Sequence, residues 1–336
     1  MAIIDSIKLS QFEFVNRIDA ELYNPIYKKS FNELLNSHLK LYKLKELCVI
    51  RSGSTPSDRD DNLSNGPILL KTTDIRNNVI CPYGDFYHIS QMIFDRMRST
   101  KLSDNDVLFN IVGATLDVIG RSGFILNFIK ANITQAMVLL RCKNNKIRPG
   151  YLFAYLNTYY AQDQVKRYAR PTGQYNLNLK EVGHIAIPLL ETIYQKEIES
   201  YVLNASQELN QSFELYTQAQ QLLDQELGLG KLKFEKPVGY KVRFSEVVSS
   251  NRLDAQHFQF KFKQLITQIK KYNLKHIRDI RSYNRRGVQP VYIANGNIDV
   301  VNSQHIGKKH LDYSNFQKTD ESIFNTFLGF STNLLI

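Results

Sequence analysis

Residues 191–230 read ETIYQKEIESYVLNASQELNQSFELYTQAQQLLDQELGLG, and this stretch decides how the chain is organised. It contains no Pro, and its first Gly is Gly228. Apolar or small side chains recur at alternating steps of four and three residues, at Ile198, Val202, Ala205, Leu209, Ser212, Tyr216, Ala219 and Leu223. Such a heptad seam is typical of a helix that pairs with another helix. We therefore predict a long spacer helix over 191–230.

The net charge changes sign at both ends of this helix. Residues 1–190 hold 24 Lys and Arg against 17 Asp and Glu, and residues 231–336 hold 18 against 8. The helix itself holds one Lys and seven acidic residues, within a chain of 336 residues and formal net charge +11. Two basic bodies around an acidic connector would attract phosphate to the bodies and leave the helix for contacts with protein.

The composition excludes several classes of protein. A hydrophobic content of 43% supports a packed core and argues against a disordered chain. No run of 18 apolar residues is present, and the first residues lack the basic and apolar regions of a secretory signal. The few, widely separated cysteines, Cys48, Cys81 and Cys142, form no C-x-x-C metal site and predict a reducing cytoplasm.

Short motifs from before the helix recur after it in the same order. The pairs are NRIDA at 16–20 with NRLDA at 251–255, YKLK at 42–45 with YNLK at 272–275, IRS at 50–52 with IRS at 280–282, and PILL at 67–70 with PVYI at 290–293. We read them as a duplicated domain. Residues 318–329 line up loosely with 101–113, so the second copy is expected to lack about the last 70–75 residues of the first.

The predicted fold class is α+β. In the first copy we expect a helix near 25–40, a helix over 149–167 and a short helix or turn with a strand over 176–188. The predicted strands are 46–51, 67–71, 106–112, 123–128 and 136–142, bounded by Gly and Pro. The predicted domains are a first domain at 1–190, the spacer helix at 191–230 and an incomplete second domain at 231–336.

Several segments resemble, in order, the specificity (S) subunits of type I restriction-modification systems. They are LKEL at 44–47, IRSGSTP at 50–56, LKTTDI at 70–75, DVL at 106–108, IGRSG at 119–123, NITQA at 132–136, TGQYNL at 172–177 and IAIP at 185–188. The family often has a double-proline segment ending in Glu-Gln before the helix, whereas here only Pro188 and Gln195 fit that pattern. The resemblance covers residues 1–230 well and 231–329 partially.

The resemblance implies two target-recognition domains held apart by antiparallel helices, each reading one half of a split site in double-stranded DNA. It implies a subunit without catalytic activity or cofactor, which docks DNA methyltransferase subunits and, in the full complex, a restriction subunit. A truncated chain could also pair with a second copy as a homodimer through the seam. The helix-pairing residues would then be Ile198, Val202, Ala205, Leu209, Tyr216 and Leu223.

Candidate DNA-binding residues are basic and polar side chains beside the predicted strands, because Arg, Lys, Asn and Gln contact phosphates and base edges. In the first copy they are Arg51, Ser54, Thr55, Lys71, Thr73, Arg76, Arg121 and Gln174. Phosphate contacts are expected from Lys166, Arg167 and Arg170, and in the second copy from Arg281, Arg285 and Arg286. The alternative for Arg51 is a structural ion pair, and for 166–170 a solvated helix end.

The motifs of catalysis are weak. NPIY at 24–27 resembles the N-P-P-Y motif of amino-methyltransferases but lacks the second Pro, and a helix entry is favoured. No P-loop or His-based metal spacing occurs, and the acidic run at 58–61 is better read as a solvated loop. The alternatives to a recognition subunit are an interaction scaffold with basic lobes, an inactive truncated remnant and a stand-alone methyltransferase.

Overall fold

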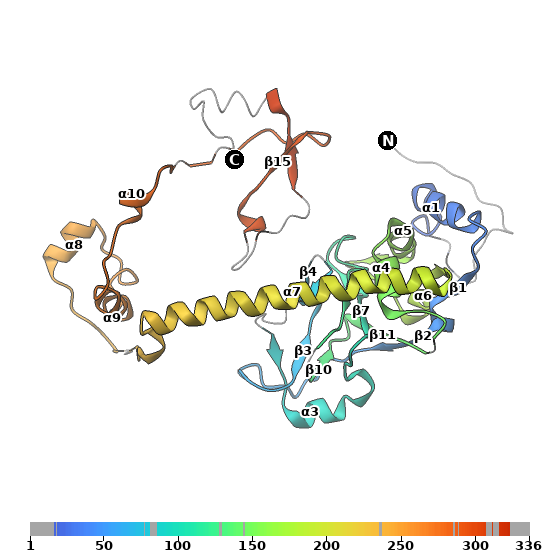
Figure 1. Ribbon diagram of the computed structural model, residues 1–336, viewed down its shortest axis with the longest axis horizontal. Helices are drawn as coiled ribbons and strands as arrows, with labels where there is room; N and C mark the ends of the chain where they lie inside the picture. The colour runs from blue at the N-terminus through green and yellow to red at the C-terminus, as the bar shows by residue number, and fades with distance from the viewer. Residues whose placement is uncertain are drawn as a thin grey trace. The chain divides into compact units, whose positions relative to one another are not determined.

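The computed structural model describes residues 17, 19–76, 78–80, 86–127, 130–143, 145–234, 237–284, 286–287, 289–306, 311 and 316–322. The chain divides into two units, Met1–Ala219 and Gln220–Ile336. The first unit mixes short strands and helices, so the predicted α+β class is confirmed (Figure 1).

The long helix α7 spans Thr192–Glu226, inside the predicted range 191–230 (Figure 1). Its 35 residues correspond to roughly 52 Å at the usual rise of an α-helix. The helix follows strand β14 (Ala186–Pro188) and ends just before Gly228. Gly228 has a φ of 66° and a ψ of 25°, a left-handed conformation that glycine adopts at little cost.

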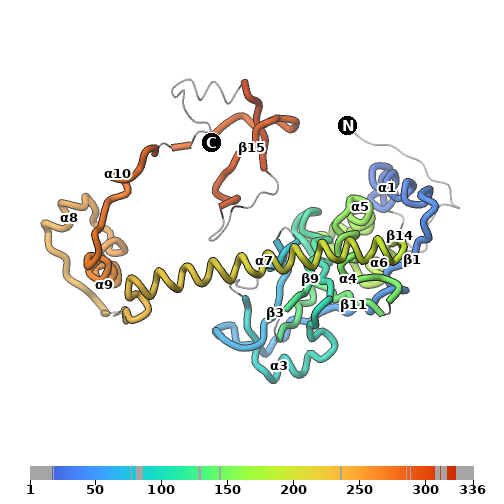
Figure 2. The backbone as a smooth tube through the Cα atoms, in the orientation of Figure 1, coloured from blue at the N-terminus to red at the C-terminus, as the bar shows by residue number. Residues whose placement is uncertain are grey.

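The central sheet of the first unit has four antiparallel strands in the order β2-β11-β7-β9. Figure 2 labels β9 and β11 of this sheet. The strands are β2 (Cys48–Ser52), β7 (Val107–Asn110), β9 (Ser122–Phe124) and β11 (Met137–Cys142). Each overlaps a predicted strand. Every residue of β7 is buried, which explains why its sequence is a continuous apolar run instead of an alternating one.

Smaller sheets surround this one. In one of them β3 (Ile68–Leu70) pairs in parallel with β10 (Ala131–Ile133) and antiparallel with β6 (Tyr87–His88). The other pairings, all antiparallel, are β1 (Leu41–Lys43) with β14, β4 (Ile75–Arg76) with β5 (Val79–Ile80), and β13 (Gln174–Asn176) with both β12 (Arg170–Thr172) and β8 (Val112–Gly113). The β1–β14 pair ties the end of the first copy back to its beginning.

The helices of the first unit are α1 (Pro25–Leu35), α2 (Leu44–Leu47), α3 (Gln91–Arg96), α4 (Pro149–Leu156), α5 (Tyr159–Tyr168) and α6 (Leu179–Val182), with the 3-10 turns η2 (Thr72–Asp74) and η3 (Arg98–Thr100). The single helix predicted over 149–167 is therefore two helices. Thr158 interrupts it with an extended backbone, and its hydroxyl caps α5 by accepting from the Ala161 N–H. Likewise, α1 ends at Leu35, short of the predicted residue 40.

The largest hydrophobic core joins the central sheet to the helices. It contains Val107, Phe109, Val138 and Leu140 from β7 and β11, and side chains from α2, α4, α5 and β14. A second core, which includes Leu70, Ile133 and Met137, lies among β3, β10 and β11. The two cores share strands of the central sheet, so the ends of these strands are held from both sides.

The second unit contains the counterpart of the first copy's opening motif. Its described elements are η4 (Leu229–Lys231), α8 (Phe244–Ser250), α9 (Phe260–Ile269), α10 (Ile277–Ile280), β15 (Ile298–Val300), η5 (Ser303–His305) and β16 (Gln317–Thr319). Arg17 Nε donates to Asp19 Oδ2 at 2.7 Å, and Arg252 Nε donates to Asp254 Oδ2 at 2.7 Å. The same local contact in both copies supports the predicted repeat at this motif.

Further along, the structure changes the alignment of the two copies. Helices α2 and α10 begin with the same capping contact, in which the N–H of the residue before the helix donates to an acidic side chain three residues later. The Lys43 N–H donates to Glu46, and the His276 N–H donates to Asp279. This equivalence sets Ile280 against Leu47, at the end of a helical turn. The predicted match of IRS at 280–282 with IRS at 50–52 is therefore wrong, because residues 50–52 lie in strand β2. The match of YKLK at 42–45 with YNLK at 272–275 is wrong as well, because the equivalence sets Lys43 against His276.

The end of the second copy is also realigned. Strand β15 is followed by η5 and pairs antiparallel with β16, as β3 is followed by η2 and pairs antiparallel with β6. The predicted matches of 290–293 with 67–70 and of 318–329 with 101–113 are therefore wrong. Short motif matches at 290–293 and 318–329 therefore selected the wrong partner segments, because the loop lengths differ between the copies. The described part of the second copy matches the first only to the start of α3.

The second copy buries little. Among its described residues, no hydrophobic side chain is buried, and the buried polar ones are His305 and Thr319. Leu44 of α2 is 0% exposed, whereas Ile277 at the same place in α10 is 74% exposed. In the first copy, α2 is covered by the segment 182–187, whose Ile185 carbonyl accepts from the Leu44 N–H at 2.9 Å.

Candidate nucleic-acid interface

Several strand ends of the first unit meet on one side of the sheets. Strands β2 and β7 both run antiparallel to β11, with Ser52 opposite Val138 and Asn110 opposite Met137. Strands β3 and β10 are parallel and end on this side as well. We call the segments 52–55, 71–74, 110–113 and 134–136 the strand-end edge. The sequence predicted Ser54, Thr55, Lys71 and Thr73 as DNA contacts, and the topology brings them to this one edge.

Backbone hydrogen bonds hold the strand-end edge in place. The Ser54 N–H donates to the Ile133 carbonyl at 3.2 Å, and the Thr134 N–H donates to the Leu70 carbonyl at 3.0 Å. A Cβ atom on Gly53 would lie 2.1 Å from the Ile133 oxygen and 2.4 Å from the Thr134 oxygen. Because both neighbours are backbone atoms, only glycine allows the loop to cross the turn this closely.

We expect Gly53→Ala to lower the free energy of unfolding of the first unit by about 1–3 kcal/mol, the usual cost of overpacking. The added methyl group must push the loop away from the turn at 133–134. Chemical denaturation followed by circular dichroism measures the effect. Gly230→Ala is the matched control, because no atom lies within 4 Å of a Cβ there. Equal stability of the two variants would contradict a rigid crossing.

The exposed side chains of this edge are polar. Ser54, Lys71 and Thr73 are exposed, and so is Gln135, which the sequence reasoning missed. The Thr55 hydroxyl donates to Gln135 Oε1 and joins the loop after β2 to the turn before β11. The signal that could have found Gln135 is its place in NITQA, a polar residue in a turn before the buried strand β11. An amide and hydroxyls can hydrogen-bond base edges, and an ammonium can pair with phosphate.

Lys71 belongs to a basic and aromatic cluster. Its Nζ lies 5.2 Å from the centre of the Tyr87 ring, and the Arg59 guanidinium carbon lies 5.7 Å from the same ring. Arg59 also forms an ion pair with Asp61, which in turn accepts from the Tyr87 hydroxyl. Cations over the face of a ring are attracted by its quadrupole. The acidic run at 58–61 thus contributes to a loop held by arginines, as Asp58 also pairs with Arg96.

Three of the five arginines proposed in the first copy, Arg51, Arg76 and Arg121, lie on or near these strands. Arg51 is exposed on β2 and forms no ion pair with any residue that the structure describes, so the structural ion-pair alternative gains no support. Arg76 is exposed on β4, and its Nε donates to the Thr73 carbonyl at 3.3 Å. Arg121 is half-buried and pairs with Asp117 at 2.8 Å. Arg51 and Arg76 are thus the more accessible cations.

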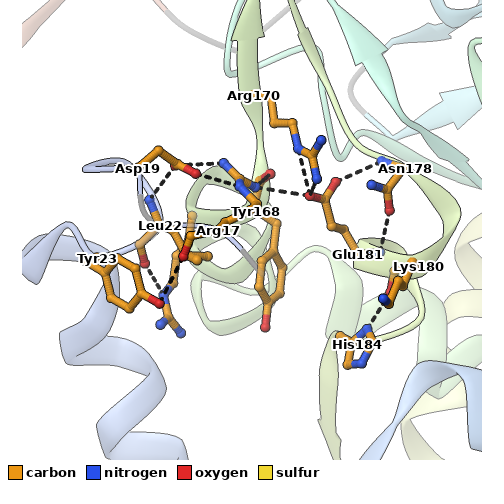
Figure 3. Close-up of polar contacts among 11 residues, drawn as sticks. Arg17, Asp19, Leu22, Tyr23, Tyr168, Arg170, Asn178, Lys180, Glu181 and His184 are labelled. Atoms are coloured by element: carbon orange, nitrogen blue, oxygen red, sulfur yellow. Dashed lines mark hydrogen bonds and ion pairs between the residues drawn. The ribbon is translucent and has the colours of Figure 1, made fainter. Parts of the chain in front are cut away.

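The predicted residue Gln174 lies on the hairpin β12–β13, where it is exposed. The base of this hairpin is held by a buried carboxylate (Figure 3). Glu181 Oε1 accepts from Arg170 Nε at 2.9 Å and from Arg17 Nη1 at 3.1 Å, and the Glu181 side chain is fully buried. Arg170 is therefore occupied in an ion pair, although part of its side chain is exposed. We refer to Arg17, Asp19, Arg170 and Glu181 as the arginine–carboxylate cluster.

The charges of this cluster affect one another. Burial alone would raise the pKa of Asp19, but the hydrogen bond and the charge of Arg17 outweigh it and leave the pKa below its ordinary value. For Arg17 burial acts to lower the pKa, but the contacts with Asp19 and Glu181 raise it overall. Arg17 and Asp19 therefore keep their charges at neutral pH, and the cluster links the opening motif of the first copy to the hairpin.

The predicted phosphate contact of Arg167 is wrong. Arg167 is 1% exposed, its Nε donates to the Leu22 carbonyl at 2.6 Å, and its guanidinium lies over the Phe31 ring. Because α5 packs on α1, this side chain is enclosed between the two helices. Lys166 on the neighbouring face is half-buried and lies 3.7 Å from Asp163. The two basic residues in the last turn of α5 therefore make contacts within the first unit, since Arg167 is buried and Lys166 lies near Asp163.

The candidates in the second copy lie in segments with little packing. Arg281 follows α10 and is exposed, and Arg286 is exposed as well. Arg285 lies outside the described residues. The two described arginines therefore follow α10, the counterpart of α2, and precede β15.

The heptad seam of α7 does not face solvent along its whole length. Ile198 packs against the main core of the first unit, so it is not available for a partner helix. Val202, Ala205 and Leu209 line a cavity of about 430 Å³ between α7 and the residues around β5, β9 and α4. Tyr216 and Leu223, further along the helix, are exposed. The later part of the seam, with Tyr216 and Leu223, is therefore the part that is open to a partner helix.

Among the described residues, no three His, Cys, Asp or Glu side chains gather closely enough to hold a metal ion. Within the same part of the chain, none of the helices combines the length and the apolar character that crossing a membrane requires.

Comparison with known proteins identifies related sequences. The family described as type I restriction modification DNA specificity domain matches residues 36–213. The type I restriction enzyme EcoBI specificity subunit of Escherichia coli is 28% identical over 187 residues, which make up 54% of this chain and 36% of that protein. The match thus spans about a third of the relative's length.

Solved structures of similar proteins give weaker likenesses. The type I restriction-modification S subunit from M. genitalium is 17% identical and aligns with 65% of this chain and 51% of its own, at a TM-score of 0.39. The HsdS subunit from Thermoanaerobacter tengcongensis is 16% identical and aligns with 60% and 48%, at a TM-score of 0.34. Because the family match at 36–213 covers more than half of the 336 residues, the chain belongs to the type I restriction modification DNA specificity domain family.

Proposed function

We propose that this chain is the DNA-recognition subunit of a type I restriction-modification complex, and that it directs methyltransferase and endonuclease partner subunits to a bipartite DNA target. The observation that carries the proposal is the strand-end edge, which gathers Ser54, Lys71, Thr73 and Gln135 on a backbone fixed by hydrogen bonds, inside the family-matched region. Phosphate contacts from Lys and Arg would position the lobe, and amide and hydroxyl contacts would read bases.

The organisation proposed with this function has three parts. Residues 1–190 are the first recognition domain, 191–230 the spacer helix, and 231–336 belong to a second domain. Catalysis belongs to the partner subunits, and the complex acts on double-stranded DNA in the cytoplasm. The later part of the spacer helix, with Tyr216 and Leu223 exposed, is the surface proposed to pair with a helix of a second copy.

The decisive experiment compares one DNA site with scrambled duplex. The chain is co-expressed with its methyltransferase partner, and the methylated positions are mapped by sequencing. We expect one split motif to be methylated, and we expect the purified complex to bind that motif more tightly than scrambled DNA at fixed salt. Methylation without any motif, or equal affinity for both duplexes, would favour the interaction scaffold with basic lobes.

Two substitutions separate positioning from reading. Lys71→Ala is expected to weaken binding to all sequences alike and to lower the slope of log affinity against log salt by about one. Gln135→Ala is expected to relax selectivity at a single base pair by about 10-fold to 100-fold, the worth of one base-edge contact. Gln218→Ala, at an exposed site on α7, is the matched control. A uniform loss of affinity in Gln135→Ala would remove it from the reading residues.

A further inference from the structure

Strands β2 and β11 bring two cysteines together that are far apart in the sequence. Cys48 opens β2, Cys142 closes β11, and the two residues are direct partners across the antiparallel pair. Both thiols are free. The sequence reasoning treated the cysteines as isolated, because the fold alone places these two side by side. The third cysteine, Cys81, lies outside the described residues.

The hydrogen-bond pattern of the ladder shows which kind of pair they form. The Lys143 N–H donates to the Leu47 carbonyl at 2.9 Å, and the Gly53 N–H donates to the Met137 carbonyl at 3.2 Å. Hydrogen-bonded and non-hydrogen-bonded pairs alternate along an antiparallel ladder, so Cys48 and Cys142 form a non-hydrogen-bonded pair. In such pairs the Cα atoms are about 4.5 Å apart and the side chains leave the same face. That separation lies within the range of about 4.4–6.8 Å that a disulfide spans.

The surroundings of the two thiols differ. Cys48 is 1% exposed and belongs to the main core, whereas Cys142 is partly exposed. The neighbouring Cys142 thiol and burial both raise the pKa of Cys48. A dissolved oxidant therefore reaches Cys142 first, and Cys48 is placed to react with whatever forms there.

We propose that Cys48 and Cys142 are a redox modification site that closes to an intramolecular cross-strand disulfide, with a hydroperoxide as the oxidant. In the first step the Cys142 sulfur attacks a peroxide oxygen, and Cys142 sulfenic acid and water form from hydrogen peroxide. In the second step the Cys48 sulfur attacks the Cys142 sulfur, the S–O bond breaks, and the hydroxyl leaves as a second water. The two thiols lose two electrons and two protons, and the peroxide is reduced to two waters.

The disulfide lies at the end of the ladder away from the strand-end edge. Loop 52–55 follows β2 and turn 134–136 precedes β11, whereas Cys48 and Cys142 stand at the opposite ends of these strands. Closing the bond joins the strands that carry the edge without crossing the edge itself. We expect the oxidised chain to exchange the amide hydrogens of β2 and β11 more slowly and to unfold at a higher temperature.

The test uses the full chain carrying Cys81→Ser, reduced and then treated with hydrogen peroxide. We expect the intact mass to fall by two hydrogens and non-reducing peptide mapping to find Cys48 joined to Cys142. Cys142→Ser and Cys48→Ala, each combined with Cys81→Ser, should lose this cross-link. Cys48→Ala keeps an apolar side chain in the core, so it remains informative if a polar variant at that site fails to fold.

Three results would overturn the proposal. These are conversion of Cys142 to sulfinic acid while Cys48 stays a thiol, a disulfide between two chains instead of within one, and unreacted thiols under peroxide that oxidises a small-molecule dithiol. The readout does not depend on DNA, so it fails or succeeds separately from the proposed function.

Discussion

Replacing Glu181 by alanine is expected to lower the free energy of unfolding of the first unit by about 3–5 kcal/mol, because it breaks a buried ion pair. The Glu181 side chain is fully buried and accepts hydrogen bonds from Arg17 and Arg170. Without it, Arg17, whose side chain is only 9% exposed, keeps Asp19 as its carboxylate partner but loses the second one. The chain contains no Trp, so urea denaturation should be followed by circular dichroism.

Two further variants define what is being measured. Glu208→Ala removes an exposed carboxylate from α7 and should change the free energy of unfolding by less than about 0.5 kcal/mol. Glu181→Gln keeps an oxygen acceptor without the charge, so its loss should fall between those of the two alanine variants. If Glu181→Ala costs under about 1 kcal/mol, the cluster does not hold the hairpin β12–β13, and Gln174 is positioned by other contacts.

Much of the first unit could be predicted because local sequence decided it. The heptad spacing of 191–230 indicated α7, and apolar runs bounded by Gly and Pro indicated β2, β3, β7, β9 and β11. The break between α4 and α5 could not be read from periodicity, because Thr158 continues the polar and aromatic pattern and interrupts the helix only through its cap. Likewise, the alignment of the two copies depends on the N-terminal capping contacts of α2 and α10. These contacts use different acidic residues, Glu46 in the first copy and Asp279 in the second.

The candidate site divides in the same way. Ser54, Lys71 and Thr73 were predictable, since polar residues directly after buried strands collect at one edge. Arg167 was not, because its charge is enclosed by α1, a helix distant in sequence, and composition carries no information on that contact. The pairing of Cys48 with Cys142 depends on the register of β2 and β11, and Gln135 reaches the site through the turn between β10 and β11. Long-range pairing therefore accounts for most of what the sequence left open.

The second large effect concerns the hydrophobic contacts of α2. Leu44→Ala is expected to destabilise the first unit by about 2–5 kcal/mol, as is usual for a fully buried leucine. Leu44 lies in the main core with Leu47, Val182, Ile185 and Ile187, and the methyl groups removed leave a cavity there. Urea midpoints of the variant and the parent chain, at equal slopes, give the difference directly.

Ile277→Ala is the matched variant in the second copy, since α10 corresponds to α2. Ile277 is 74% exposed, so the substitution should cost less than about 0.5 kcal/mol. The two substitutions then differ in their effect on the free energy of unfolding because the segment 182–187 covers Leu44, whereas Ile277 is exposed. If Ile277→Ala costs as much as Leu44→Ala, α10 is covered in solution, and residues 231–336 behave as a packed domain able to hold a second strand-end edge in place.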